Sequence, residues 1–392
     1  MKYKFLFVVQ GEGRGHFTQA IAVAEVLTEA GHEITAVLVG SGTNREIPDF
    51  VRKCIPAPFI RFESPNFSTD VNSRSIRLGK SIWNTLHRFS YYQKSMKQIS
   101  ETIASYAPDM VINFYEPLAG FSKKWHGWKT PLVAIAHQYV YLHPEFRFPA
   151  GAGKIEQYYI RLYTKLTALG ANALLALSFY PFSKAYHKNI KIAPPLLRSG
   201  IRAQESYEGN HYLIYLVNAG YIESVIDWHK KYPETIIHCF TDSKMIRGSW
   251  QVSEGLTFHS LDDTRFLRYL SSAKGVMTTA GFETVCEAMY LAKPVLMVPV
   301  EGHFEQWCNA RDGAKAGAGI YASAFDLNPL INLTDTAKEK RASFIQWADQ
   351  AKEILFDFIL SSFKKEKSTF SKTIYLEMNK NQETETSIQS IV

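Results

Sequence analysis

Short apolar runs alternate with amphipathic stretches along most of this sequence, and the alternation starts twice. The second start follows the consecutive prolines Pro194 and Pro195. Unbroken apolar runs are typical of strands buried on both faces of a parallel sheet, and the amphipathic stretches are typical of its covering helices. The pattern predicts two α/β domains, residues 1–195 and 201–330, joined by a linker near Gly200. The runs are Phe5–Gln10, Ile34–Val39, Met110–Phe114, Leu132–Ala136 and Ala173–Leu177 in the first domain, and Tyr212–Val217, Ile236–Phe240, Gly275–Thr278 and Val295–Val298 in the second.

The sequence after the second domain predicts one long helix and a polar tail. Between residues 336 and 363, apolar side chains recur at three- and four-residue intervals, so one face of this helix needs a surface to bury. Beyond Lys364 the chain is polar, and we expect residues 364–392 to form a disordered tail.

Composition limits the environment and the partners of the chain. Of its 392 residues, 46% are apolar, which excludes wholesale disorder. The four cysteines lack the spacing of a disulfide framework or a zinc site, so we expect reduced thiols and a cytoplasmic protein. No apolar stretch approaches the roughly 20 residues of a membrane-spanning helix. The net charge of +7 favours anionic partners, such as nucleotide diphosphates, anionic lipids or nucleic acid.

A glycine-rich loop follows the first predicted strand. Gly11, Gly13 and Gly15 precede His16, and residues 18–29 have helical spacing. The free amides and about half a positive charge at a helix start favour an anionic or polar ligand there. The spacing GxGxG differs from the dinucleotide fingerprint GxGxxG, so a tight turn without a ligand is the alternative. His16 would lie at the carboxyl edge of the sheet, where it could remove a proton from an acceptor hydroxyl.

Two segments resemble known glycosyltransferases. They are the loop segment GEGRGHFTQAIAVAEVLTEAGHEI and, from Thr278 to Ile320, TTAGFETVCEAMYLAKPVLMVPVEGHFEQWCNARDGAKAGAGI. Both resemble parts of glycosyltransferase families 1 and 28, which include the peptidoglycan N-acetylglucosaminyltransferase. The resemblance implies the GT-B fold, in which two Rossmann-like domains with parallel sheets face each other across a cleft and a C-terminal helix crosses back to the N-terminal domain. The first domain would bind the acceptor and the second domain a nucleotide-sugar donor.

The resemblance also implies a set of donor-binding residues, and their chemistry suits that role. Gly281 allows a turn into a helix whose first amides, with the Thr284 hydroxyl, can hold a diphosphate without a metal ion. Glu287 lies almost one turn further along and can accept hydrogen bonds from both ribose hydroxyls. An ordinary βαβ unit with common caps is the alternative. The donor set is Gly13, Arg14, Gly15, Asn218, Gly220, Ala280, Gly281, Phe282, Thr284, Glu287, Glu305 and Gln306, the last two contacting the sugar.

One position departs from the pattern of these families. Many members have His or Arg directly before the small residue and the glycine of the donor turn, whereas this chain has Thr279 before Ala280. The missing contact to the diphosphate would then come either from Arg14 of the other domain or from the turn at Asn218 to Gly220.

Further residues are assigned to the acceptor side. His137 and Gln138 follow a predicted strand and resemble positions at the cleft edge in a related archaeal and bacterial subgroup. Glu116 follows another strand and is an alternative catalytic base to His16, although a carboxylate at such a place is often a helix cap.

The stretch between Asp70 and Glu101 is basic and aromatic. Residues 71–100 contain no acidic side chain, and their lysines and arginines are interleaved with aromatic residues. This composition suits an anionic membrane surface, such as the inner face of the cytoplasmic membrane. An amphipathic helix with its aromatic side in the core is the alternative. Nucleic acid is not expected as a partner, because no recognised reading motif accompanies the charge.

The sequence and this resemblance therefore predict a metal-independent glycosyltransferase, and the resemblance implies that the transfer inverts the configuration. It would transfer a hexosyl or N-acetylhexosaminyl group from a UDP-sugar to a hydroxyl acceptor, with lipids and lipid-linked molecules among the candidates, and would need no cofactor besides the donor. A nucleotide-sugar epimerase and a non-catalytic nucleotide-sugar-binding protein on the same fold are the alternatives. An epimerase would need acids and bases at the sugar and no acceptor site.

Overall fold

A computed structural model of the chain describes residues 2–42, 47–65, 88–216, 219–243, 245–333 and 338–363. Asn218, most of the basic and aromatic stretch, and the tail 364–392 lie outside the described residues. None of the helices in the described ranges has both the length and the apolar character needed to cross a membrane.

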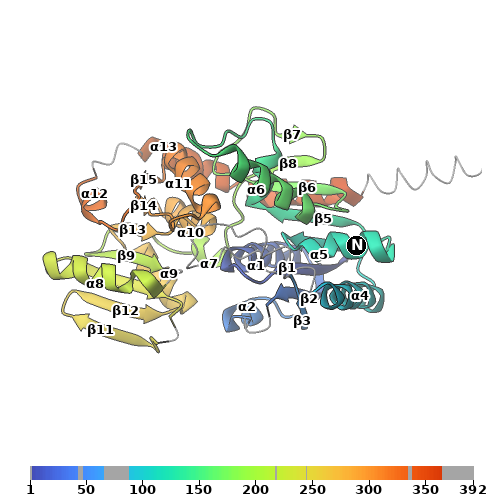
Figure 1. Cartoon of the computed structure of the whole chain (residues 1–392), viewed down its shortest axis with the longest axis horizontal. Helices are drawn as coiled ribbons and strands as arrows, with labels where there is room; N and C mark the ends of the chain where they lie inside the picture. Colours follow the sequence, from blue (N-terminus) through green and yellow to red (C-terminus); the bar gives the residue numbers. More distant parts are fainter. Residues whose placement is uncertain are drawn as a thin grey trace, which may run out of the picture.

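Eight strands form the first sheet, in the order β3-β2-β1-β4-β5-β6-β8-β7 (Figure 1). Neighbouring strands are parallel except at the edge, where β7 is antiparallel to β8. The strands are β1 (Lys4–Gln10), β2 (Glu33–Ser41), β3 (Phe59–Glu63), β4 (Met110–Phe114), β5 (Leu132–Ala136), β6 (Ala173–Leu177), β7 (Tyr186–His187) and β8 (Ile190–Ala193). The helices of this domain are α1 (Arg14–Glu29), α2 (Asp49–Cys54), α4 (Phe89–Tyr106), α5 (Pro117–His126), the 3-10 helix η1 (His137–Leu142) and α6 (Lys154–Thr167).

Helices cover both faces of the first sheet. Side chains of a strand alternate between faces, so Leu6 and Val8 pack against α4 and α5, whereas Phe5 and Phe7 pack on the side of α1 and α2. Helix α6 packs on the same face as α4 and α5, next to β5 and β6. This double coverage explains why the strands are apolar at nearly every position.

The second sheet has the order β11-β12-β10-β9-β13-β14-β15 and is parallel except for the edge strand β11. Its strands are β9 (His211–Leu216), β10 (Ile236–Thr241), β11 (Ser249–Ser253), β12 (Leu256–Ser260), β13 (Gly275–Thr278), β14 (Val295–Met297) and β15 (Gly319–Tyr321). Its helices are η2 (Ala219–Tyr221), α8 (Ile222–Lys231), α9 (Asp263–Ser271), α10 (Phe282–Tyr290), α11 (Phe304–Ala316) and α12 (Asn328–Ile331), and a short helix α7 (Ser199–Arg202) lies in the linker. Helices α8 and α12 cover one face, and α9, α10 and α11 cover the other.

The predicted α/β class and all predicted strands are confirmed. The strands that the sequence did not predict were overlooked for a common reason. Strands β4, β5, β6 and β13 have the predicted bounds. The overlooked strands β3, β7, β8, β11, β12 and β15 are short or carry polar residues, because most of them lie at or near a sheet edge where one face or flank meets solvent.

The prediction of one long C-terminal helix is wrong. Helix α13 (Lys338–Ala348) ends in a turn at residues 349–350, and a second helix occupies residues 351–363. The Arg202 guanidinium donates to the Ala348 carbonyl (2.8 Å) and to the Asp349 carboxylate (2.7 Å), which stabilises the break. The apolar periodicity continues through the break because both helices bury a face.

The C-terminal segment crosses from the second domain to the first, as the GT-B resemblance implies. Helix α13 packs against α10 and α11. In the following helix, Phe363 stacks on Tyr3 beside β1, with ring centroids 4.8 Å apart, and Lys352 pairs with Glu29 of α1. The two domains are therefore joined twice, by the linker and by this crossing.

Helix α5 allows a test of the packing in the first domain. A Cβ at Gly120 would lie 1.9 Å from the Leu169 carbonyl oxygen, a backbone atom that no rotamer change can move away. We expect Gly120→Ala to lower the free energy of unfolding by about 3 kcal/mol. At the C-cap of the same helix, Gly127 has a φ of +67° but open space, so Gly127→Ala should cost only about 1 kcal/mol of conformational strain. Chemical denaturation of both variants measures the difference, and equal losses would contradict this packing.

Candidate active site

Each sheet has one place where the strand order reverses, and the predicted site residues follow the strands at these places. In the first sheet the chain moves from β1 outward to β2 and β3 and then returns to β4 beside β1. In the second sheet it moves from β9 to β10 and β12 and then returns to β13. At such a switch point the loops after the two neighbouring strands lead in opposite directions and leave a crevice between them. Open α/β sheets bind their ligands in this crevice. His16 follows β1, Glu116 follows β4, and Gly281 follows β13.

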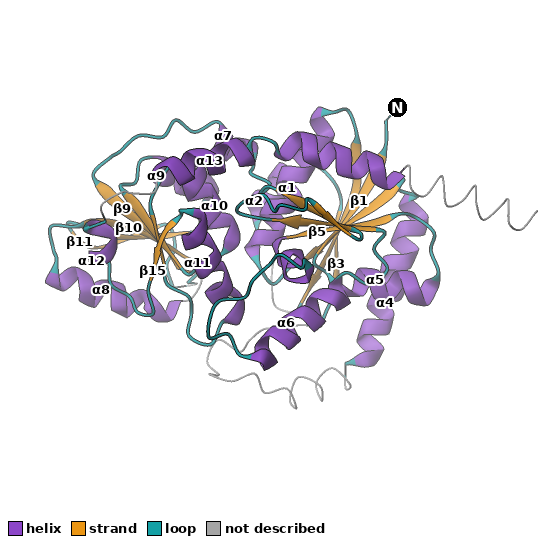
Figure 2. Ribbon diagram, turned by 90° about the horizontal axis from the view of Figure 1, so that it is seen from above, coloured by secondary structure: helices purple, strands orange, loops and turns teal. Residues whose placement is uncertain are grey.

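The starts of α1 and α10 meet across the domain interface (Figure 2). Gln19 Nε2 donates a 2.6 Å hydrogen bond to Glu283 Oε1, and a Cβ at Gly15 would lie 3.2 Å from Glu283 Cγ. The glycine of the loop therefore permits the close approach. His16 belongs to the first turn of α1, so the interface brings this imidazole to the side of the second domain from which α10 begins.

The start of α10 has the geometry of an anion site. Its N-cap, Gly281, has extended backbone angles and makes no side-chain cap, and the space around its missing Cβ is open. The preceding Ala280 has a φ of +61°, which turns the chain sharply, and its carbonyl accepts from Asn309 Nδ2 (3.2 Å). Uncapped amides and the helix dipole together favour a negatively charged ligand here.

Several buried polar atoms at this interface lack a hydrogen-bond partner within the described residues. They are His16 Nδ1, Gln19 Oε1, Thr278 Oγ1, Thr279 Oγ1 and Glu283 Oε2. Buried polar atoms in proteins are almost always paired, with water or a ligand where the protein supplies no partner. These atoms come from the starts of α1 and α10 and from the end of β13, so they mark one place that is suited to a polar ligand.

His16 is held as a neutral imidazole. Its ring stacks on Tyr115 at the end of β4, with centroids 5.4 Å apart and planes 23° apart. Burial lowers the pKa of His16 to about 4, although the interaction with Gln19 opposes the shift. At neutral pH the ring therefore carries one proton and has a lone pair with which it can accept another.

Glu116 is a buried helix cap. Its carboxylate accepts from Leu118 N (3.0 Å) at the start of α5 and from Ser64 Oγ (2.7 Å), and burial raises its pKa to about 7. The other carboxylate oxygen lies close to the backbone of Gly40. A Cβ at this position would lie 2.2 Å from the oxygen, so the absence of a side chain at Gly40 leaves room for it. The side chain is fully buried in the first domain.

Glu287 lies one turn into α10 and has a partner that the sequence reasoning missed. Arg198 of the linker donates from Nη2 (2.7 Å) and Nε (3.2 Å) to Glu287 Oε1, and its Nη1 pairs with Asp263. No hydrogen bond to Glu287 Oε2 occurs within the described residues. Burial raises the pKa of Glu287, and the Arg198 charge opposes this shift. The sequence did contain a signal for this buried ion pair, because Arg198 directly follows the apolar sequence PPLL.

His137 and Gln138 link the first domain to α10 and α11. The His137 ring stacks on Phe282 with centroids 3.8 Å apart, and its Nε2 lies 3.1 Å from Asn309 Oδ1. Gln138 Nε2 donates to Glu305 Oε1 (2.9 Å). Both side chains therefore lie in the domain interface, beside residues predicted to bind the donor: Phe282 for His137 and Glu305 for Gln138.

The remaining predicted donor residues surround the same interface. Gly13 is the N-cap of α1, and Arg14 pairs with Asp242 of the second domain (2.9 Å). The Gln306 side chain accepts from Val300 N (2.9 Å), and Thr284 is half-buried in the first turn of α10. Gly220 lies in η2, which follows β9.

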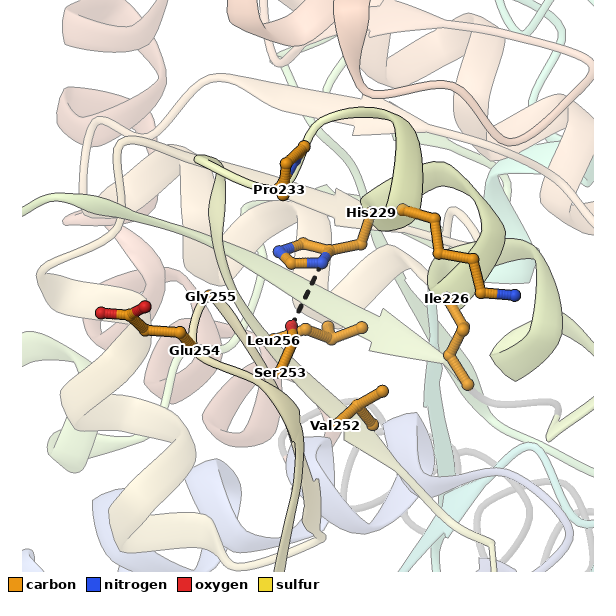
Figure 3. A pocket seen from close by; sticks show the side chains of 9 residues that line it. Ile226, His229, Pro233, Val252, Ser253, Glu254, Gly255 and Leu256 are labelled. Carbon is orange, nitrogen blue, oxygen red and sulfur yellow. Dashed lines mark hydrogen bonds between the residues drawn. The ribbon is translucent and has the colours of Figure 1, made fainter.

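A separate cavity of about 370 Å³ lies on the second domain (Figure 3). It is lined by Ile226, His229, Lys230, Pro233, Val252, Ser253, Glu254, Gly255 and Leu256. This is the edge at which β12 begins, opposite the carboxyl edge that binds ligands in such sheets. Both His229 ring nitrogens are hydrogen-bonded, to Ser253 Oγ and to the Thr235 carbonyl. We therefore separate this cavity from the candidate active site.

The described residues contain no evident metal site. No group of three or more His, Cys, Asp or Glu side chains is arranged there to hold a metal ion.

Comparisons with known proteins identify the family of the chain. The family model for glycosyl transferase family 1 matches residues 3–336. Two curated relatives, both described as uncharacterized glycosyltransferases, come from Methanosarcina acetivorans (25% identical, covering 81% of this chain and 82% of the relative) and Methanosarcina mazei (24% identical, covering 81% and 85%).

Solved structures share the fold. The calicheamicin glycosyltransferase CalG4 matches with a TM-score of 0.62 and 14% identity, covering 93% of this chain and 98% of that one. MurG from Acinetobacter baumannii matches with a TM-score of 0.53 and 18% identity, covering 92% and 100%. The family match and the two facing sheets lead to one conclusion: the chain belongs to glycosyl transferase family 1 and is a glycosyltransferase with the GT-B fold.

Proposed function

We propose that this glycosyltransferase transfers a hexosyl or N-acetylhexosaminyl group from a UDP-sugar to a hydroxyl group of the acceptor, with inversion and without a metal ion or another cofactor. The observation that carries the proposal is the uncapped start of α10 beside the turn of α1 that bears His16. One element offers an anion site, and the other offers a neutral base.

The diphosphate of the donor binds at the start of α10. The amides after Gly281 and the Thr284 hydroxyl donate to phosphate oxygens, with Ala280 and Phe282 shaping the turn. As the bond to the sugar breaks, negative charge develops on the leaving phosphate, and the fixed helix dipole stabilises it. This stabilisation is the role that a metal ion would otherwise fill.

The ribose is bound by Glu287. Arg198 occupies one carboxylate oxygen and holds the group in place, so the other oxygen can accept from the ribose hydroxyls. On the far side of the diphosphate, Glu305 and Gln306 contact the sugar hydroxyls, and Gln138 orients Glu305 through their hydrogen bond.

The acceptor hydroxyl is activated by His16. The imidazole is neutral at physiological pH and lies on the first domain, whereas the leaving group lies on the second. Attack from one domain on a sugar whose leaving group is held by the other favours a single displacement, which inverts the configuration. We assign Glu116 to capping α5, since the side chain is fully buried in the first domain and its Oε1 accepts from Leu118 N and Ser64 Oγ.

The acceptor is presented at an anionic membrane surface, on the cytoplasmic leaflet. Helices α4, α5 and α6 lie side by side on one face of the first domain (Figure 2). This surface, the α4–α6 face, exposes Phe89, Tyr91, Phe121, Trp125, Ile155, Tyr158 and Leu162, and the lysines and arginines Lys94, Lys97, Lys124, Lys154, Arg161 and Lys165. Exposed aromatic groups amid basic ones suit insertion at the headgroup level of anionic lipids.

Incubation of the purified chain with labelled UDP-hexoses, with and without a panel of hydroxyl acceptors, tests the reaction class. We expect UDP release and a labelled product only when an acceptor is present. Conversion of the donor to an isomeric UDP-sugar without acceptor would show an epimerase instead, and binding without any conversion across the panel would show a binding protein.

The assignment of the base predicts a pH profile. Because the pKa of His16 is lowered to about 4, kcat/KM should stay within about threefold between pH 8 and pH 5.5. If Glu116 were the base, with its pKa raised to about 7, kcat/KM at pH 5.5 would be about thirtyfold lower than at pH 8. We also expect His16→Ala to keep UDP affinity and to lower kcat by about two to four orders of magnitude. Full activity of this variant would remove His16 from the mechanism.

The ribose assignment predicts a loss of donor affinity in Glu287→Gln. This change keeps the shape of the side chain but removes the charge, so the hydrogen bonds to the ribose weaken and UDP affinity should fall about tenfold, or about 1.4 kcal/mol. Asp263→Asn is the matched control, because it weakens the other ion pair of Arg198 without a role at the ribose. Isothermal titration calorimetry measures both variants. A similar loss in the two would attribute the effect to Arg198 alone.

The membrane proposal predicts co-sedimentation with vesicles. Vesicles containing phosphatidylglycerol should bind the protein more strongly than pure phosphatidylcholine, and salt should weaken the binding because part of it is electrostatic. Replacing Trp125 and Tyr158 together by Ser should lower the partition coefficient about tenfold, because their apolar area enters the interface. Trp250→Ser, an exposed tryptophan of the second domain, is the control and should change nothing. Equal binding of all variants would contradict the α4–α6 face.

A further inference from the structure

A buried carboxyl group lies where the proposed diphosphate binds. Glu283 occupies the first turn of α10, two residues after Gly281, and only 7% of the residue is exposed. Gln19 Nε2 donates to its Oε1, whereas its Oε2 is buried and has no partner within the described residues. The carboxyl therefore brings one unsatisfied oxygen to a helix start that favours anions.

Within the described residues, Glu283 has no counterion that is free of other partners. On its own helix the nearest charged group is Glu287, which is also acidic, and from α1 it faces the uncharged Gln19. The linker contributes Arg198, but this guanidinium already binds Glu287 and Asp263.

The arginine of the glycine-rich loop, Arg14, is also paired with an acidic residue. Arg14 pairs with Asp242, and Thr279 stands where related enzymes have a basic residue. An ionised Glu283 would therefore place a negative charge next to a doubly charged diphosphate, and the described residues supply no unpaired cation between them. Like charges this close in a buried site repel strongly.

We propose that Glu283 is a positioning residue for the donor: it is protonated when the donor binds, and its Oε2–H donates a hydrogen bond to the diphosphate. This inference rests on the proposed function, because it assigns a role at the same diphosphate site. The proton belongs on Oε2 because Oε1 already accepts from the Gln19 amide.

The environment of the group supports this protonation state. Burial raises the pKa of Glu283 to about 8, and the nearby Glu287 charge adds to this shift, whereas the Gln19 hydrogen bond and the Arg198 charge oppose it. A protonated carboxyl turns a repulsive neighbour of the phosphate into a hydrogen-bond donor. Gln19 then couples the acceptor-side helix to the donor, since it orients the carboxyl that contacts the phosphate.

Proton linkage gives the expected result. If the donor binds only the protonated form, raising the pH above the pKa of Glu283 weakens binding by a factor approaching ten for each pH unit. Titrating the full chain with UDP by calorimetry should therefore give a Kd about tenfold higher at pH 9 than at pH 7. Glu283→Gln, whose amide keeps a donor at this place, should bind UDP at pH 7 as the wild type does and lose the pH dependence.

A matched control variant, and the ratio of the Kd values of variant and wild type, isolate the effect of Glu283 on UDP binding. Glu223 is an exposed glutamate in the first turn of α8, so Glu223→Gln should keep the full pH dependence. Titration of UDP itself is common to all the proteins and cancels in the ratio of their Kd values. Circular dichroism at each pH confirms that the proteins compared are folded.

The outcomes separate the two proposals. A wild-type Kd for UDP that changes less than threefold between pH 7 and pH 9 overturns the role of Glu283 and leaves the proposed function standing. A Glu283→Gln variant that is folded but binds UDP more than tenfold more weakly at pH 7 also overturns it, since the carboxylate would then be required. No UDP binding by the wild type at any pH overturns both.

Discussion

The hydrogen bond between Gln19 and Glu283 joins the starts of two helices that begin at the switch points of two different sheets. The apolar core on the inner side of the first sheet continues through this contact into the second domain, so the surrounding polar groups are withdrawn from water. One cause, burial, then lowers the pKa of His16 and raises those of Glu116 and Glu283. At neutral pH the interface therefore holds fewer charged side chains than its number of histidines and glutamates would suggest. In such a water-poor environment, fixed dipoles stabilise the developing charge of a transition state most strongly.

Much of this arrangement is readable from the sequence. The unbroken apolar runs predict the central strands, and the glycines with the residues after them predict where the two helices start. Arg198 was missed because its role depends on Glu287 and Asp263, which are distant in the chain. Glu283 was missed because a glutamate in a first helical turn is ordinary, and only its burial against α1 makes it unusual. The break after Ala348 has the same origin, since it depends on a guanidinium from the linker.

The linker does more than connect the domains. Its Arg198 binds the second domain through Glu287, while Ser199 donates from its backbone amide and its hydroxyl to Glu25 of α1. Four residues after Arg198, Arg202 binds the turn of the C-terminal crossing. Removing one partner from a buried ion pair leaves an uncompensated charge, so the buried Arg198–Glu287 pair in particular resists displacement. The donor-side carboxylate and the chain crossing are thus held by the same short segment.

This division of contacts indicates how the interface can open for a substrate. The linker and the crossing lie on one side of the interface, whereas Gln19 with Glu283 and Arg14 with Asp242 connect the domains through side chains alone. The Arg14 pair is partly exposed, so water replaces it at little cost, whereas the Gln19 hydrogen bond is buried and forms only while the domains are in contact. Separation of the domains would break these two contacts, together with those of His137 and Gln138, and would leave Glu287 on Arg198. The carboxylate of Glu287, proposed to bind the ribose, would keep its orientation in the open state, and a returning α1 would restore the contact between Gln19 and Glu283.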